Sequence, residues 1–195
     1  VKPTPSGFGE ALELLAAGAG GELVAVDLGG ATCDVFSVHD GQVFRSVSAN
    51  LGLSFSLGAV CHRAGWDRVD RWLPAPAAEE QLRDRVRNKM IRPTTLPQTV
   101  DDLLLEQAAA REAVRLAIAD HGRALQPLRG AGEGPTGIEA LVHVALPESG
   151  IRWEAVDLLV GSGGPLAHAP RREQAAAILL DACRSLGVTE LAVDS

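Results

Sequence analysis

The chain has 195 residues, of which 46% are hydrophobic and 22% charged, so it can bury a core and is too apolar for a disordered tail. Its net charge of −7 excludes the basic surface that nonspecific nucleic-acid binding requires, and we expect no nucleic-acid partner. Apolar runs stay below the roughly 18 residues that a membrane-spanning helix needs, so we expect no membrane partner.

The cysteines are odd in number, scattered and without CxxC spacing: Cys33, Cys61 and Cys183. Neither a disulfide framework nor a zinc site follows from this pattern. The N-terminus also lacks the charged and apolar pattern of a signal peptide. We therefore expect free thiols in a reducing cytoplasm.

The first part of the chain predicts a short helix followed by three strands. Pro3 and Pro5 stand near the helix start, and the glycines of residues 18–21 end it. ELVAVDLGG is a continuous apolar run bounded by glycines, which is typical of a buried central strand. Two runs rich in β-formers follow, separated by HDG, whose Asp40-Gly41 pair favours a tight hairpin. We predict strands at roughly residues 22–28, 32–38 and 42–48.

The middle of the chain predicts mostly helix. GAVCHRAG is a short helix, and DRVDRWLPAPAAEEQLRDRVRNKM is mostly helical with interruptions at Pro74 and Pro76. Residues 93–97, PTTLP, form a rigid break. The strongest helix prediction covers residues 99–125, with Thr99 as the N-cap and apolar residues at helical spacing.

The last part of the chain returns to a strand and helix pattern. Residues 127–137 predict a flexible loop, and AVDLLVGSGG is again an apolar strand that ends on glycines. RREQAAAILLDACRSLG predicts a helix ended by Gly187, and ELAV predicts a closing strand. The order of elements indicates an α/β core of residues 1–58 and 150–195, interrupted by a mostly helical insertion of residues 59–149.

The stretch DLGGATCD places two acids and a hydroxyl around a glycine bend. The bend consists of Gly29, Gly30, Ala31 and Thr32. Its closely spaced N–H groups could hold a phosphate, because no bulky side chain obstructs them. Asp27 and Asp34 would be repelled by that phosphate unless a divalent cation intervened, and Mg²⁺ held mainly through waters satisfies this condition. A plain two-glycine hairpin is the alternative.

A second glycine cluster ends the later apolar strand. It consists of Gly161, Ser162, Gly163 and Gly164. Two strand-terminal glycine turns that flank a helical insertion suit a nucleotide, since one can hold phosphate and the other lets backbone approach the nucleoside. Ser162 resembles a catalytic nucleophile only weakly, because the full GxSxG context is missing.

These features resemble the actin, sugar-kinase and heat-shock-chaperone ATPase superfamily. DLGGATCD is similar to its second phosphate loop, VGSGG to its adenosine loop, and the helical block to its inserted subdomain. Within the superfamily the chain resembles the MutL-type glutamate mutase accessory proteins, which are unrelated to the mismatch-repair protein of that name. The stretches that carry this resemblance are VDLGGATCDVFSV, NLGLSFS, NKMIRPTTLPQT, LEQAAAREAVRLA and VGSGGPLAHAP.

The resemblance implies an actin-like ATPase (ribonuclease H-like) lobe with a mixed sheet, ATP and Mg²⁺ as cofactors, and a mutase subunit as partner. Such proteins are thought to act as ATP-dependent accessory or reactivating chaperones for adenosylcobalamin-dependent mutases. Asp27 and Asp34 then resemble the acids near Mg²⁺ that serve catalysis. Residues 29–32 resemble the phosphate turn, and residues 161–164 resemble the adenosine turn.

The resemblance covers nearly all of this chain but only the C-terminal half of such a protein. Residue 1 is Val rather than Met, and the chain ends on LAVDS, so we interpret it as an excerpt from a longer protein. The first phosphate loop of the other lobe is absent. We therefore expect slow ATP hydrolysis from the joined lobes and none from this lobe alone.

Two positions depart from the family pattern. Cys33 stands where Thr is usual, and strand alternation predicts that it points away from the polar side of the turn. Asn50 begins NLGLSFS where Asp is expected. Of the histidines, His168 could touch the nucleotide or cap a helix, and His62 beside Cys61 predicts packing or surface exposure rather than a metal site.

Charged residues in the helical block have two interpretations. Arg111 and Arg115, at helical spacing, could reach over the adenine, but pairing with Glu106 and Glu112 is the favoured interpretation. A basic stretch from Arg83 to Arg92 predicts either a solvated face or a surface for a partner protein.

Two other functions stay open. The chain could be a lobe of a hydantoinase or oxoprolinase-like ATP-dependent enzyme, although no residues for an amide substrate are evident. It could also be a degenerate lobe that serves as an interaction module and binds no nucleotide. The genes that adjoin this one would separate the first of these from the accessory protein.

Overall fold

The computed structural model describes residues 9–12, 14–15, 21–39, 41–129, 150–183 and 186–194. The strands are β1 (Glu22–Leu28), β2 (Thr32–His39), β3 (Gln42–Ala49), β4 (Val156–Ser162) and β5 (Glu190–Val193). The helices are α2 (Leu57–Ala64), α3 (Trp66–Asp70), α4 (Glu79–Ile91), α5 (Val100–Arg129), α7 (Gly164–Ala167) and α8 (Arg172–Ala182), with a 3₁₀ turn η1 (Trp153–Ala155). Within these ranges no helix is both long and apolar enough to cross a bilayer.

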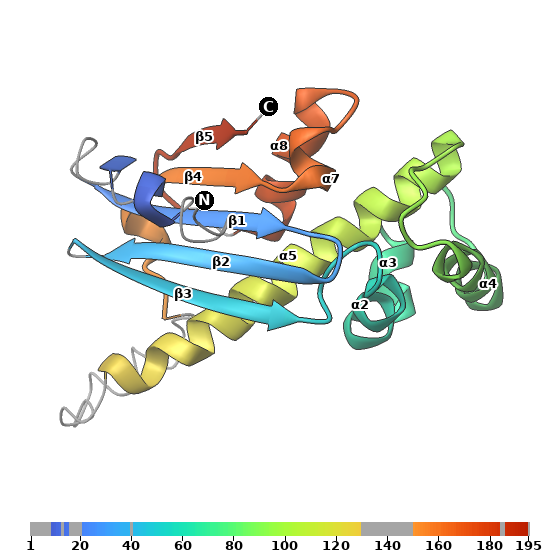
Figure 1. The fold of residues 1–195 in the computed structure, drawn as a ribbon, viewed down its shortest axis with the longest axis horizontal. Helices are drawn as coiled ribbons and strands as arrows, with labels where there is room; N and C mark the ends of the chain where they lie inside the picture. Colours follow the sequence, from blue (N-terminus) through green and yellow to red (C-terminus); the bar gives the residue numbers. More distant parts are fainter. Residues whose placement is uncertain are drawn as a thin grey trace.

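The strands form one mixed sheet in the order β3-β2-β1-β4-β5 (Figure 1). β1 pairs antiparallel with β2, as β2 does with β3, whereas β1 with β4 and β4 with β5 are parallel pairs. A parallel pair needs a crossover connection, and the helices between β3 and β4 provide it. The predicted mixed α/β class is thereby confirmed, with the first three strands close to their predicted bounds.

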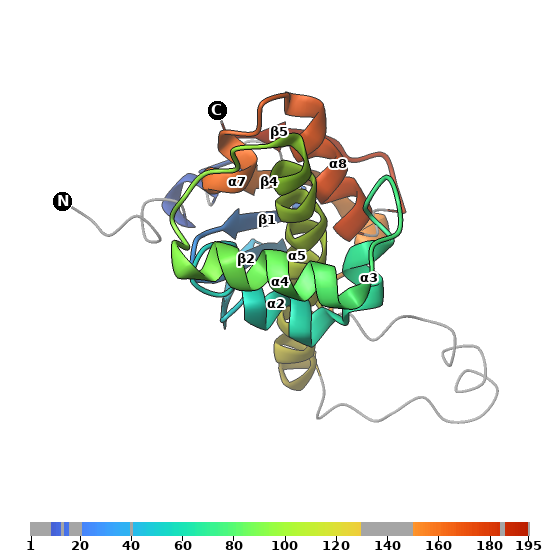
Figure 2. The same ribbon diagram turned by 90° about the vertical axis from the view of Figure 1, so that its right-hand side faces the viewer.

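The long helix α5 covers one face of the sheet (Figures 1 and 2). Alanines such as Ala109 and Ala113 are fully buried along it, and their small side chains let the helix approach closely. They share one hydrophobic cluster with Val24, Val26 and Leu28 of β1. The opposite side of β1 is buried too, which explains its continuous apolar run.

The second face of the sheet has its own smaller core. Its buried members are Leu12, Leu23, Ala25, Phe36, Val38 and Val160. Leu12 belongs to helical residues 9–12, which confirms part of the predicted N-terminal helix. The other residues of that prediction, apart from 14–15, lie outside the described part of the chain.

A buried histidine of α5 forms hydrogen bonds with two strands of the sheet. His121 Nε2 lies 2.8 Å from Oγ of Ser37 in β2, and its Nδ1 lies 2.8 Å from Oγ of Ser46 in β3. Burial lowers the pKa of His121 to about 4, so the ring is neutral near pH 7. Nothing in the sequence pattern singled out this residue.

The start of α5 was predicted well and its end was not. Thr99 Oγ1 accepts from the Asp102 amide at 3.1 Å, and the Thr99 amide donates to Asp102 Oδ2 at 3.2 Å, which confirms the predicted N-cap. The helix continues to Arg129, so the predicted loop of residues 127–137 is wrong for its first residues. Residues 130–137 lie outside the described ranges.

The helix predicted up to Gly187 ends earlier, at Ala182, because Cys183 adopts an extended backbone with ψ 140°. Residues on both sides of the predicted insertion boundaries share one core, among them Val24 of β1, Ala113 of α5 and Leu179 of α8. The division between residues 1–58, 59–149 and 150–195 stays a prediction.

Candidate functional site

The bend between β1 and β2 leaves adjacent backbone donors available. The amide of Gly29 donates to the carbonyl of Thr32 at 2.9 Å and closes the hairpin. The amides of Gly30 and Ala31 donate to no atom of the residues that the structure describes. Two neighbouring free N–H groups on a glycine bend form a small anion-binding concavity.

The carbonyls of this bend are held by residues 52–56, which we name the clamp segment. Ser54 and Phe55 donate their amides to Gly30 O at 2.8 and 3.0 Å, and Ser56 Oγ donates to Ala31 O at 2.9 Å. A Cβ at Gly52 would lie 2.3 Å from the Ala31 nitrogen, so only glycine permits this approach. The clamp segment therefore fixes the bend without using its amides.

Asp27 and Asp34 lie side by side on the two strands that enter and leave the bend. They are register partners in the antiparallel pair, which places them on the same face of the sheet. Asp34 is 6% exposed, and its Oδ2 accepts from Arg45 at 2.9 Å. Its Oδ1 is buried and finds no hydrogen-bond partner within the described chain.

Burial, followed by the negative charge of Asp34, raises the pKa of Asp27, while Arg45 opposes the shift. Two crowded carboxylates with one unpaired buried oxygen form a site that a cation would stabilise.

The second glycine turn touches the first. Asp27 is the register partner of Ser162 in the parallel pair of β1 and β4. Gly163 has φ +93°, and a Cβ there would lie 2.2 Å from Leu28 O. The two turns thus lie at the same end of neighbouring strands, which is where ligands bind in open α/β sheets.

A third acid lies beside this pair and was missed from the sequence. Ser162 Oγ donates to Asp194 Oδ2 at 3.2 Å, and the Asp194 amide donates to Gly161 O at 2.9 Å. The charge of Asp194 contributes to the raised pKa of Asp27. The available signal was an acid directly after the last apolar strand, as at Asp27 after its own run.

The other two glycines of the second turn have different surroundings. A Cβ at Gly161 would lie 2.5 Å from Leu179 Cδ1, so its missing side chain makes room for α8. Gly164 begins α7, and nothing lies within 4 Å of a Cβ placed there. The backbone around Gly164 is therefore open to a ligand.

The donor set fits Mg²⁺ held mostly by water and phosphate. Within the described ranges, no group of three or more His, Cys, Asp or Glu side chains could hold a metal ion by itself. Mg²⁺ commonly binds nucleotide sites through one or two carboxylates and keeps several waters. The partly exposed Asp27, crowded by Asp34, offers that kind of contact.

Comparison with known proteins decides the family. A family model described as MutL protein matches residues 1–188. The chain belongs to the MutL protein family. It is also similar to Protein MutL of Clostridium tetanomorphum, with 25% identity over 186 residues that cover 85% of this chain and 38% of that protein. The chain thus spans well under half the length of this curated relative.

The departures in this MutL-family chain have structural explanations. Cys33 is fully buried in the core on the α5 side, which confirms that it points away from Asp34 and the polar face. Asn50 has φ +61° and lies exposed after β3. Asn tolerates this left-handed conformation better than most residues with a side chain, so it suits the turn.

The predicted ion pairs of the helical block are confirmed only in part. Arg115 pairs with the fully buried Glu112 at 2.7 Å, as predicted. Glu106 instead pairs with Lys89 at 2.6 Å. Arg111 reaches α8 and pairs with Asp181 at 2.6 Å. The predicted pairing of Glu106 with an α5 arginine is wrong, because α4 and α8 bring their own charges against α5.

A groove between α5 and α8 contains an unpaired amide. It is lined by Gln107, Arg111, Arg171, Glu173, Gln174 and Ala177, with a volume of about 570 Å³. Gln107 is 9% exposed, and its Nε2 has no hydrogen-bond partner in the described chain. Arg171 follows shortly after α7, which itself starts at Gly164. Sequence patterns give no sign of this site.

Of the two histidines, only the prediction for His62 is tested, and contact of His168 with a nucleotide stays a prediction. His62 is exposed while Cys61 is buried, so their side chains diverge as predicted. His168 is exposed, and its amide donates to Gly164 O at 3.0 Å, which ends α7.

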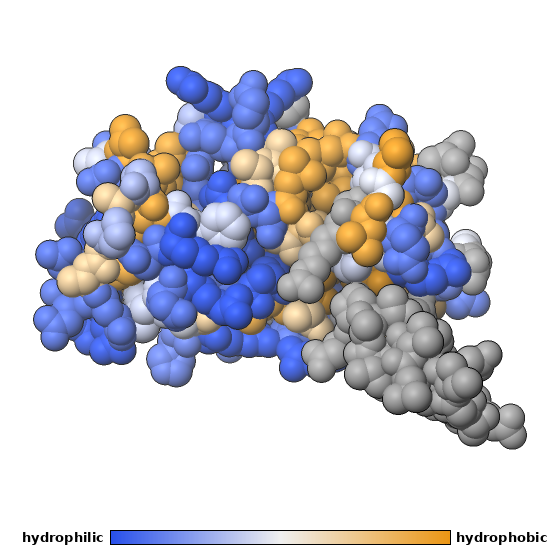
Figure 3. All heavy atoms as spheres, turned by 180° about the vertical axis from the view of Figure 1, so that it is seen from behind, coloured by the Kyte–Doolittle hydropathy of each residue, from blue (hydrophilic) through white to orange (hydrophobic). Residues whose placement is uncertain are grey.

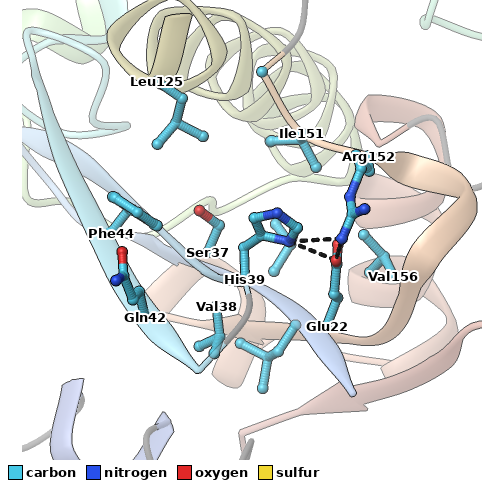
Figure 4. A pocket seen from close by; sticks show the side chains of 13 residues that line it. Glu22, Ser37, Val38, His39, Gln42, Phe44, Leu125, Ile151, Arg152 and Val156 are labelled. Atoms are coloured by element: carbon cyan, nitrogen blue, oxygen red, sulfur yellow. Dashed lines mark hydrogen bonds and ion pairs between the residues drawn. The ribbon is translucent and has the colours of Figure 1, made fainter. Parts of the chain in front are cut away.

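A separate cavity of about 210 Å³ lies at the opposite end of β1 from the glycine bend (Figure 4). There His39 Nδ1 lies 2.5 Å from Glu22 Oε1, and Arg152 also pairs with Glu22. Ser37, Leu125 and the other lining residues surround the space. The ion cluster ties β1, β2 and the segment before β4 together, so we interpret it as structural.

Proposed function

We propose that this MutL-family chain is the nucleotide-binding lobe of an ATP-dependent accessory chaperone for an adenosylcobalamin-dependent mutase, with an actin-like ATPase fold. The observation that carries the proposal is the meeting of the two glycine turns at one end of β1 and β4, where Asp27 is the register partner of Ser162. A single nucleotide could contact both turns. Had they lain on opposite sides of the molecule, the proposal would have failed.

In this proposal the first bend receives the phosphates. The free amides of Gly30 and Ala31 donate to phosphate oxygens, and the half-buried Thr32 adds its hydroxyl. The clamp segment holds the bend in place beforehand, so little ordering is needed when the ligand arrives.

The two acids would hold Mg²⁺ through its waters. Mg²⁺, when bound, neutralises phosphate charge and makes the phosphorus easier to attack. Arg45 pairs with Oδ2 of Asp34 and holds that side chain in place beside Asp27. Asp27 would orient a water beside the phosphates. The negative charge of Asp34 contributes to the raised pKa of Asp27, so removal of Asp34 should favour the ionised form of Asp27.

The second turn and the groove between α5 and α8 would receive the nucleoside. Gly164 presents backbone with nothing within 4 Å of a Cβ placed there, so a ribose can approach closely. Gln107 has an unpaired buried donor, and an acceptor nitrogen on a purine would satisfy it.

The partner is proposed from the family. Membership in the MutL family supports the accessory role that the sequence resemblance implies, and ATP would act through closure of two lobes around the nucleotide. The mutase would receive that change as altered contacts with the accessory protein.

Isothermal titration of the full-length protein with Mg-ATP tests the proposal. We expect micromolar to millimolar affinity, lowered at least tenfold by Asp27→Asn. Glu80→Gln, the same change of acid to amide at an exposed position of α4, should leave the affinity unchanged. No binding at millimolar nucleotide, or equal binding by both variants, would show that this is a degenerate lobe or that the site lies elsewhere.

A further inference from the structure

A second groove lies in the helical block, near the start of α5. It lies between α4, the connection after it and the start of α5, and has a volume of about 510 Å³. Leu57 and Leu105 contribute its apolar lining, and Arg85, Lys89 and Arg92 its cations. Figure 2 shows α4 lying across this end of the molecule. We name it the α4–α5 groove.

Large apolar side chains are exposed beside the groove in the described part of the chain. Ile91 is 76% exposed, Leu96 77% and Val100 71%. Ile91 and Leu96 line the groove itself. Seen from behind, this end of the molecule shows apolar side chains next to strongly hydrophilic ones (Figure 3). Apolar clusters rimmed by polar groups are typical of protein interaction sites.

The charge left over in the groove is positive. Lys89 and Glu106 neutralise each other at 2.6 Å. Asp102, the second acid of the lining, interacts electrostatically with Arg85, which also donates to the backbone carbonyl of Asp101. Arg92 has no ionic partner among the described residues, so one positive charge remains. A positive groove in a chain of net charge −7 complements a segment that carries carboxylates.

The groove is also connected to the candidate nucleotide site. Ser56 of the clamp segment holds the carbonyl of Ala31, and the next residue, Leu57, is fully buried and lines the groove. A displacement of the glycine bend would therefore shift Ser56 and, with it, the adjacent Leu57 in the groove lining.

We propose that the α4–α5 groove docks an acidic segment with apolar anchors from the protein partner of the proposed function, on which this inference rests. The apolar anchors lie against Ile91 and Leu96, and a carboxylate pairs with Arg92. The nucleotide bound at the glycine bend alters the affinity through the clamp segment.

The test measures binding of the purified adenosylcobalamin-dependent mutase to the full-length protein by biolayer interferometry, with Mg-ATP titrated in parallel. Leu96→Asp and Arg92→Glu should each weaken mutase binding at least tenfold and leave Mg-ATP affinity unchanged. The matched controls are Val47→Asp, at an apolar residue 52% exposed on β3, and Arg87→Glu, at an arginine already paired with Asp84. Both controls should bind the mutase within twofold of the unmodified protein.

Equal mutase binding by the groove and control variants would overturn the docking site and leave the proposed function intact. If the unmodified protein binds Mg-ATP but not the mutase, the mutase is not the partner. The proposal that a segment of the mutase occupies the groove is then also contradicted. A dimer that Leu96→Asp converts to a monomer, with mutase binding unchanged, would identify a second copy of this chain as the occupant and contradict the proposal.

Discussion

The carboxylate of Asp27 lies against the backbone of Gly163. A Cβ at Gly163 would stand 2.7 Å from Oδ1 of Asp27 and 2.2 Å from the carbonyl oxygen of Leu28. Gly163 also has φ +93°, which side chains disfavour. The contact between the two glycine turns therefore depends on the absence of a single side chain.

Gly163→Ala should disrupt this contact, while Gly164→Ala should not. We expect the first to cost about 1–3 kcal/mol of unfolding free energy, because it combines a strained φ with a backbone clash. It should also weaken Mg-ATP binding at least tenfold. A Cβ at Gly164 meets nothing within 4 Å, so that variant is the control for stability. Urea denaturation measures the stability of both variants, and equal stability would contradict the described turn. Nucleotide titration measures the loss of binding in Gly163→Ala.

Gln107→Leu should separate base binding from phosphate binding. The variant removes a buried amide nitrogen that has no partner in the described chain, so the free protein should keep its stability or gain up to about 1 kcal/mol. Its affinity for ATP should fall about tenfold, whereas its affinity for tripolyphosphate should stay the same. Gln81→Leu at an exposed position of α4 provides the control. Unchanged ATP affinity would exclude the groove between α5 and α8 as the base site.

His121 should make stability fall in mild acid. Its pKa is about 4 in the folded protein and about 6.5 when unfolded, so between these values the unfolded chain binds the extra proton. Its contribution to stability is complete above about pH 6.5 and is lost as the pH falls toward 4. From pH 7 to pH 5 we expect a loss of about 2 kcal/mol that His121→Gln lacks.

Urea denaturation at both pH values measures this difference, with His62→Gln at an exposed position of α2 as the control. Equal pH dependence in the His121 variant and the unmodified protein would show that burial does not hold the ring neutral.

Local patterns predicted the strands and the bends, and long-range pairing decided the rest. The apolar run before Asp27 and the glycines after it are local signals, so β1 and its turn could be read directly. Arg45 and Asp194 reach the site only because β3 and β5 pair in particular registers, and a single sequence does not show register. Gln107 depends in the same way on how α8 packs against α5.

Glu112 should be a determinant of stability in the helical block. Its carboxylate is fully buried and accepts from Trp72 Nε1 at 2.9 Å, and it pairs with Arg71 and Arg115. Glu112→Leu should cost about 2–4 kcal/mol, because the indole and the arginines lose their acceptor. Glu112→Gln keeps an acceptor for the indole and should cost less. Thermal unfolding distinguishes the two, and equal melting temperatures for both variants and the unmodified protein would contradict this arrangement.

A crystal structure of the full-length protein with Mg²⁺ and a non-hydrolysable ATP analogue is the most direct test of the central claim. The account predicts phosphate oxygens within hydrogen-bond distance of the Gly30 and Ala31 amides, a hydrated Mg²⁺ beside Asp27 and Asp34, and the nucleoside against Gly163 and Gly164. A nucleotide bound elsewhere, with this bend free of phosphate, would contradict it.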